Sequence, residues 1–362
     1  MYVSSDPLTY HEIIASLDPL SADEIMGRLP ALNHSGDVPA IVELLTELLA
    51  RVGDTARFGR LDAVAVMREL GFFLGSLRRH GLQPVREIPG LEPILERLAH
   101  MTDMPPRDTL LHCTVWNPPE PRMRRFTDYR DELCLLESVR RAMRPLESAI
   151  HCLQAAYEIP PNTPEFVSLC DVATKGLSHL VKNTLFARSN VSLSIFAREL
   201  RPYFDSIVVA DREYLGPGAV EMPVFLVDHI LWSANTELPW LVDFKRRYLP
   251  YILPSLRAVY RHFESRPSLI ERVLRVAHQT HAESSRWRAG LAALRRVFSV
   301  LIQFRAPHTQ LAGQAYAVES GGSRDVGSGG YSPDVLREVL ECTRQHRNRL
   351  AVRLDTPGGV AA

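Results

Sequence analysis

The chain has 362 residues, of which 46% are hydrophobic and 23% are charged. This balance is typical of a globular protein long enough for a large core or two domains, and it excludes a disordered or fibrous chain. Basic and acidic residues number 42 each, so no net charge favours nucleic acid or an anionic membrane. The start of the chain lacks a secretory signal pattern and no apolar run could span a bilayer, so we expect a cytoplasmic protein.

Helical periodicity dominates the first part of the chain. Apolar residues recur at intervals of three and four over residues 31–52, which predicts a helix with Asp37 as its N-cap. The same pattern over residues 61–81 predicts a helix that ends at Gly81. The basic residues just before Gly81 favour this end, because positive charge is stabilising at a helix C-terminus.

Two proline-rich stretches interrupt the helical pattern. The first, residues 116–132, combines adjacent prolines with a run of charges. We place a domain boundary there, between a small, mostly helical domain over residues 1–120 and a large helical domain over residues 121–362. The second stretch, residues 158–166, predicts a connection between two helices.

The second half of the chain is also mainly helical. Helical patterns recur over residues 133–158, 268–280 and 333–350. Residues 206–210 are the best candidate for a strand, and the Gly/Ser-rich residues 319–332 predict a loop before the last helix. The sequence therefore predicts a mainly α protein.

Common chemical motifs are absent or incomplete. The five cysteines, at positions 113, 134, 152, 170 and 342, never form Cys-x-x-Cys, so we expect free thiols rather than disulfides or a zinc site. Residues 216–221, GPGAVE, lack the third glycine of a dinucleotide-binding loop. His278 and His281 have a spacing that could hold a metal, but their polar surroundings favour a solvated helix face.

His308 lies on an apolar helix face. The residues that share this face by their spacing are Leu294, Val297, Phe298, Leu301, Phe304, Leu311 and Ala315. A histidine in such a place is either a core residue or a ligand. Pro307 removes one backbone hydrogen bond and should kink the helix beside His308. Arg305, one turn earlier, could pair with an anionic group such as a porphyrin propionate.

Long stretches of the chain resemble known haem proteins. The strings are YLGPGAVEMPVFLVDHILWS, FKRRYLPYILPSLRAVYRHFESRPSLIERVL, FRAPHTQLAGQAY and GSGGYSPDVLREVL. Together they resemble the catalytic domain of the indoleamine 2,3-dioxygenase superfamily. With GFFLGSLRRHG, LLHCTVWNP and PGLEPILERLA, the resemblance to one bacterial family of pyrrolnitrin biosynthesis covers nearly the whole chain. It implies an indoleamine 2,3-dioxygenase-like fold, in which a small N-terminal domain covers the distal pocket of a large helical haem domain.

The resemblance also implies roles for individual residues. His308 corresponds to the proximal ligand of a haem b iron, with Arg305 and Asp228 paired on the proximal side. Three residues, Gly216, Gly218 and Ala219, correspond to a loop over the distal haem face. Three more, Tyr316, Ser328 and Gly329, correspond to positions at the substrate.

The implied substrate is 7-chloro-L-tryptophan, and the partner is O₂ or another oxidant. The indole ring of this substrate would be rearranged to give monodechloroaminopyrrolnitrin, with loss of the carboxyl carbon. A neutral imidazole ligand suits O₂ binding at ferrous haem. Tyr316 and Ser328 would hold the amino-acid chain folded back so that its amine reaches the indole C2 atom. The roles of His112, Cys113 and Trp116 in the distal pocket stay open.

Two alternatives remain at the level of sequence. A tryptophan or indoleamine 2,3-dioxygenase would use the same haem site to cleave the indole C2–C3 bond. A non-enzymatic helical interaction protein would contain His308 as a buried core residue. Neither alternative involves nucleic acid or a membrane.

Overall fold

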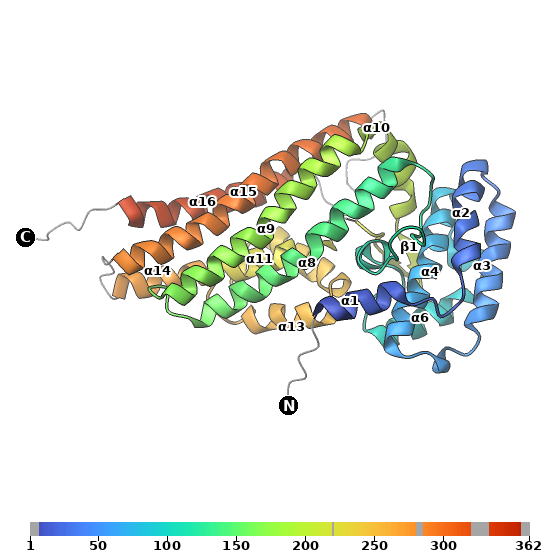
Figure 1. The fold of residues 1–362 in the computed structure, drawn as a ribbon, viewed down its shortest axis with the longest axis horizontal. Coiled ribbons are helices and arrows are strands. Elements are labelled where there is room, and N and C mark those ends of the chain that lie inside the picture. The colour runs from blue at the N-terminus through green and yellow to red at the C-terminus, as the bar shows by residue number, and fades with distance from the viewer. Residues whose placement is uncertain (1–6, 219–220, 280–284, 320–332, 356–362) are drawn as a thin grey trace, which may run out of the picture. The chain divides into compact units, whose positions relative to one another are not determined.

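The computed structural model describes residues 7–218, 221–279, 285–319 and 333–355 (Figure 1). Within these ranges the protein is mainly helical, as the sequence predicts. Its one sheet is a hairpin in which β1 (Ile207–Val209) pairs antiparallel with β2 (Arg212–Tyr214). The strand pattern at residues 206–210 is therefore confirmed. Ala210 and Asp211, between the strands, have φ of 47° and 58°, as a two-residue hairpin turn requires.

Contacts divide the chain into two compact units. The first comprises Met1–Arg140, Ala187–Glu221 and Gln314–Tyr331, and the second comprises Arg141–Phe186, Met222–Gly313 and Ser332–Ala362. Three long helices have residues in both units: α8 (Arg130–Glu158), α9 (Pro164–Asn190) and α15 (Ser285–Glu319). The domain boundary near residue 120 stays a prediction.

The first unit contains most of the short helices. They are α1 (Pro7–Ser16), α2 (Asp23–Ser35), α3 (Val38–Val52), α4 (Arg60–Arg79), α5 (Pro84–Glu87), α6 (Leu91–Thr102), α7 (Leu110–Cys113) and α10 (Leu193–Ile195), with the turns η1 (Thr55–Arg57), η2 (Phe196–Leu200) and η3 (Arg201–Phe204). The predicted helix ends are confirmed. Asp37 accepts a hydrogen bond from the Ala40 amide at 3.2 Å, and Gly81 follows α4 with φ of 81°, a conformation that favours glycine.

Helix α4 forms the centre of the first unit, where it packs against α1, α3, α6 and α7. Every residue from Ala63 to Leu77 is buried. Gly71 makes room for the segment before α7, because a Cβ atom there would lie 2.2 Å from the Cβ of Asp108. A larger residue would displace Asp108, so this glycine fixes how closely that segment approaches α4.

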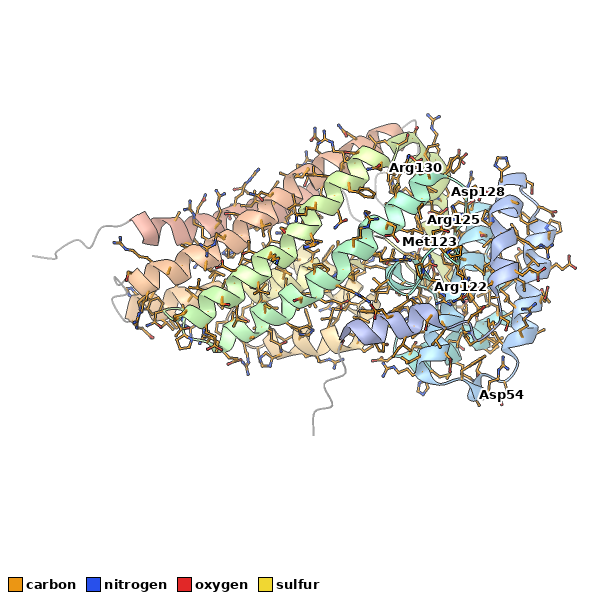
Figure 2. All side chains as sticks on the ribbon, viewed as in Figure 1. Asp54, Arg122, Met123, Arg125, Asp128 and Arg130 are labelled. Atoms are coloured by element: carbon orange, nitrogen blue, oxygen red, sulfur yellow. The ribbon has the colours of Figure 1, made fainter. Side chains whose placement is uncertain are left out.

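The proline-rich segment before α8 is packed into the first unit rather than extended. Figure 2 labels Arg122, Met123, Arg125, Asp128 and Arg130 along it. Its buried Arg124 donates through Nε to Glu69 Oε2 at 2.9 Å. Glu69 also pairs with Arg68 at 2.5 Å, and Arg68 donates to the Trp116 carbonyl at 2.8 Å. Charged groups without solvent need such partners, so this cluster holds the segment on α4.

The second unit contains the longer helices. Besides its parts of α8, α9 and α15 it has α11 (Val224–Asp228), η5 (His229–Ser233), α12 (Pro239–Tyr248), η6 (Leu249–Tyr251), α13 (Pro254–Phe263), α14 (Leu269–Gln279) and α16 (Pro333–Asp355). The helices predicted at 133–158, 268–280 and 333–350 are confirmed, and the second proline-rich stretch joins α8 to α9. The predicted loop at 319–332 falls on residues 320–332, outside the described residues.

Helices α8, α9, α15 and α16 are the long helices of this unit (Figure 1). Gly176 lets α9 approach α8, since a Cβ there would lie 2.5 Å from the Pro145 carbonyl oxygen. Arg296 of α15 pairs with Asp171 of α9 at 2.7 Å. The apolar face of α15 packs inward, with Leu294, Val297, Phe298 and Leu301 each 0% exposed. The first part of the predicted apolar face is thus the core face of the helix, whereas Phe304 and Leu311 further along it are only half-buried.

Two expectations from composition can be compared with the described residues. All five cysteines are free thiols, as predicted. Among the described helices, none combines the length and the apolar character needed to cross a membrane.

Candidate functional site

His308 lies on α15 beyond the fully buried part of its apolar face. The helix continues through Pro307 without interruption. The His308 ring is partly exposed and stacks on Phe304, with ring centroids 5.3 Å apart and planes 13° apart. Neither ring nitrogen has a hydrogen-bond partner among the described residues. Burial, followed by the positive charge of Arg305, lowers the pKa of His308 to about 4. The imidazole is therefore neutral at pH 7, with its nitrogens uncommitted.

One turn before His308, the predicted pair of Arg305 and Asp228 is present. Arg305 Nη2 donates to Asp228 Oδ2 at 2.5 Å, and the two residues are 6% and 5% exposed. Arg305 Nη1 donates to the Thr343 hydroxyl at 2.6 Å, so both terminal nitrogens bind protein acceptors. This leaves little of the guanidinium for a propionate, and the structure supports the pairing with Asp228 rather than that alternative.

The second carboxylate oxygen of Asp228 is also bound. The Trp232 indole N–H donates to Asp228 Oδ1 at 2.9 Å, and the Trp232 ring stacks on His346 with centroids 5.2 Å apart. Thr343 and His346 both belong to α16. A buried ion pair is stable only when such further bonds compensate for lost hydration. Here those bonds connect α11, α15 and α16 at the turn that precedes His308.

The turn η5 (His229–Ser233), which carries Trp232, contains a second buried polar group. Lys245 Nζ donates to the Ser233 carbonyl at 2.6 Å and lies 3.3 Å from His229 Nδ1. His229 Nε2 contacts the Tyr260 carbonyl at 3.1 Å, so Nε2 carries the proton and Nδ1 accepts from Lys245. Burial lowers the pKa of Lys245 to about 8. Sequence patterns did not single out Lys245, because its partners lie far from it in the chain.

These residues fit a haem better than a metal ion bound by protein alone. Within the described ranges, no three His, Cys, Asp or Glu side chains come together as a metal site would require. A haem iron needs only one or two protein ligands, because the porphyrin supplies four nitrogens. The neutral, uncommitted imidazole of His308 has the chemistry of such a ligand, and the anchored Arg305 turn fixes the helix that carries it.

The glycine loop assigned to the cofactor belongs to the first unit. Its described part runs from Leu215 to Gly218, and Ala219 lies outside the described residues. Gly216 is buried against the end of η3, where a Cβ atom would lie 1.9 Å from the Phe204 carbonyl oxygen. Only glycine fits at this position without moving the backbone.

A buried polar cluster adjoins this loop. Fully buried Arg107 donates to the carbonyls of Asp205 and Tyr214, at 3.1 and 3.4 Å. Glu221, 3% exposed, accepts from the Leu110 amide at 2.6 Å. Sequence reasoning missed both residues. The available signal was an acidic side chain at 221 inside an otherwise apolar stretch.

His112 and Trp116, whose roles the sequence left open, are buried in the first unit. The Thr109 amide donates to His112 Nδ1 at 3.0 Å, while His112 Nε2 is buried without a partner among the described residues. Burial lowers the pKa of His112 to about 3, with Arg68 and Arg107 contributing. The Trp116 indole N–H donates to His11 Nδ1 at 2.9 Å, which makes Trp116 a structural anchor for α1.

The residues predicted to bind substrate cannot be placed. The helical backbone of Tyr316 is described but its side chain is not, and Ser328 and Gly329 lie outside the described residues. Of the two histidines whose spacing could hold a metal, His278 is exposed on α14, and His281 lies outside the described residues.

The fold of the described residues is mainly helical and of the haem dioxygenase-like class. A family model described as monodechloroaminopyrrolnitrin synthase PrnB matches residues 10–357. Because that match covers nearly the whole chain, the protein belongs to this family, and the resemblance inferred from sequence is confirmed. The family is one of enzymes acting on a small molecule. The alternative of a non-enzymatic interaction protein is therefore wrong.

The Arg305–Asp228 pair generates a stability prediction. Asp228→Asn leaves the Arg305 guanidinium buried without a counter-charge, so the free energy of unfolding should fall by roughly 3 kcal/mol. Urea unfolding of the apoprotein measures this loss. Asp171→Asn is the matched control, because Asp171 and its partner Arg296 are each about half exposed; there the loss should stay below about 1 kcal/mol. Equal losses in the free energy of unfolding would show that the buried pair contributes no more to stability than the exposed pair.

Proposed function

We propose that the protein is a haem b enzyme that converts 7-chloro-L-tryptophan to monodechloroaminopyrrolnitrin by indole rearrangement and decarboxylation. Two findings support the proposal: the family match over residues 10–357, and a neutral imidazole at His308 that makes no hydrogen bond within the described residues. The family match carries the proposal, and the second finding supports the cofactor assignment because a neutral ring nitrogen has a lone pair that can bind iron. Cytoplasmic location and use of O₂ or another oxidant belong to the same proposal.

In this proposal His308 is the iron ligand, and Arg305 and Asp228 fix its helix. When bound, haem b supplies the redox centre for the reaction. Thr343 and Trp232 saturate the ion pair, so the turn that carries His308 cannot rotate without breaking several buried hydrogen bonds. The ligand orientation is then set before the cofactor binds, as a preorganised site requires.

The overall reaction sets what the remaining residues must do. Decarboxylation and rearrangement remove carbon dioxide and two hydrogens from the substrate, and the external oxidant takes up the electrons. The amino-acid chain must be held so that its amine reaches indole C2. On the basis of the family resemblance, we assign this task to Tyr316, Ser328 and Gly329. On the same basis, we assign contact with the cofactor to Gly216, Gly218 and Ala219.

His308→Ala tests the iron ligand. The variant should fold, because the His308 ring is partly exposed and makes no hydrogen bond to the described residues, but it should purify without stoichiometric haem. Absorption spectra and iron content per chain measure the result, and circular dichroism reports folding. His278→Ala, at an exposed histidine of α14, is the matched control and should retain haem. Full haem content with an unchanged axial-ligand spectrum in His308→Ala would refute the assignment.

The lowered pKa of His308 predicts how haem binding depends on pH. With a pKa of about 4, the ring stays neutral from about pH 7.5 to about pH 5, so haem affinity should change less than about twofold over this range. An exposed histidine with a pKa near 6.5 would lose about thirty-fold at pH 5. Titration of apoprotein with haem measures the affinity, with circular dichroism as a check on folding. A steep loss above pH 5 would contradict the proposed environment of His308.

The product decides between rearrangement and ring cleavage. Holoenzyme, 7-chloro-L-tryptophan and an oxidant should give a product lighter than the substrate by carbon dioxide and two hydrogens. Cleavage by a dioxygenase would instead give a product heavier by two oxygen atoms. Mass spectrometry separates the two outcomes, and unmodified L-tryptophan in parallel tests the need for chlorine. A product with two added oxygens would replace the proposed reaction by the dioxygenase alternative.

A further inference from the structure

Both ends of the glycine loop are bound by one short segment of the first unit. At its start, the Arg107 guanidinium donates to the Tyr214 carbonyl at 3.4 Å. Beyond its described end, the Glu221 carboxyl accepts from the Leu110 amide at 2.6 Å. Arg107 and Leu110 are only three positions apart, so residues 107–110 hold the loop at two points.

The segment that binds the loop is itself rigidly held. Arg107 donates through Nη2 to Asp108 Oδ1 at 3.1 Å and through Nη1 to the Asp205 carbonyl at 3.1 Å. Gly71 of α4 admits the Asp108 side chain at close range. Arg107 and Asp108 are 0% and 1% exposed. The loop is therefore attached to the core of the first unit rather than to a mobile surface.

Glu221 has an unusual environment for an acidic residue. Its Oε1 atom is buried without a partner in the described part of the chain. Burial is the main cause that holds the pKa of Glu221 well above its usual range; Asp108 adds to it, and the Leu110 amide and Arg107 oppose it. The carboxyl also interacts electrostatically with the buried Cys113 thiol, whose pKa is raised chiefly by burial. Glu221 thus has a pKa raised by burial, and one of its two carboxyl oxygens is bound within the described part of the chain.

We propose that Glu221 is a positioning residue, which together with Arg107 holds Leu215–Gly218 in the conformation required for catalysis. The geometry of the attachment is independent of the cofactor, whereas its importance for turnover rests on the proposed function. Glu221 itself need not touch substrate or haem. It acts through the Leu110 amide and through the backbone of the loop that it fixes.

Hydrogen exchange measured by mass spectrometry tests the attachment. Glu221→Ala removes the acceptor of the Leu110 amide, so exchange in peptides covering Leu110 and Leu215–Gly218 should become at least about tenfold faster. Glu221→Gln retains an oxygen acceptor for the Leu110 amide, so its exchange should match the parent. Parental exchange in Glu221→Ala would overturn the proposal.

Glu132→Ala is the matched control for general destabilisation. Glu132 is a buried glutamate that accepts from the amides of Phe126 and Thr127, at 2.8 and 2.7 Å, and it makes no hydrogen bond to the described loop residues Leu215–Gly218. Its truncation should lower global stability without selective exchange at Leu215–Gly218. If Glu132→Ala accelerates exchange there as much as Glu221→Ala does, the effect is global and the proposal fails.

The parent protein offers a test that needs no loop variant to fold. A buried acid with a raised pKa stabilises the attached loop most below its unfolded pKa, and this stabilisation is lost as pH rises toward the folded value. Protection of the Leu110 amide, corrected for intrinsic exchange, should therefore fall with rising pH by up to about tenfold per unit. Protection independent of pH in the parent protein would contradict a raised pKa of Glu221 and its hold on the Leu110 amide.

The role of Glu221 in catalysis is tested by measuring turnover of 7-chloro-L-tryptophan by haem-loaded protein. Glu221→Ala should lower kcat at least about tenfold at unchanged haem content per chain, and Glu221→Gln should restore most of the loss. Faster loop exchange with an unchanged kcat would overturn the role in catalysis. If the parent enzyme forms no product, the proposed function fails, and the exchange experiment still decides whether Glu221 holds the loop.

Discussion

The buried ion pair between Arg305 and Asp228 is the constraint on which the arrangement around His308 depends. Two opposite charges almost without solvent are tolerated only if their remaining hydrogen-bonding groups are satisfied. Trp232 and Thr343 meet this requirement from η5 and α16. The need to satisfy one pair therefore fixes the relation of four elements within the second unit, α11, η5, α15 and α16, and His308 follows one turn later on α15.

The first unit uses buried charge in the same way. Arg124 and Arg68 share Glu69, and Arg107 is paired with Asp108, all of them nearly or fully buried. Each arginine also donates to backbone carbonyls, so it orders loops that have no apolar core of their own. Glu221 completes this pattern from the opposite side, since it presents a carboxyl to a backbone amide. Polar contacts, rather than helix packing, thus determine the shape of the irregular segments.

Sequence predicted what local chemistry determines. The Asp37 cap, the end of α4 at Gly81 and the apolar face of α15 each depend on neighbours within a few residues, and all are confirmed. The pairing of Arg305 with Asp228 came from resemblance, because residues 77 positions apart leave no local signal. Lys245 and Arg107 were missed for the same reason, whereas Glu221 had a local signal, its place in an apolar stretch, that was not used. Their burial is set by distant segments, and a charged residue in sequence normally indicates a surface.

A single ligand also explains why motif reasoning alone left His308 ambiguous. Metal sites built from protein have several ligands at fixed spacings, whereas a porphyrin needs one imidazole and leaves no such pattern. Hydrogen bonding distinguishes the environments of two histidines in the second unit. The buried His229 ring binds Lys245 and the Tyr260 carbonyl through its two nitrogens. The His308 ring is partly exposed and makes no such bond within the described residues. The protein therefore fixes the ring of His229 on both sides, whereas the described residues leave both nitrogens of His308 open to a ligand or to water.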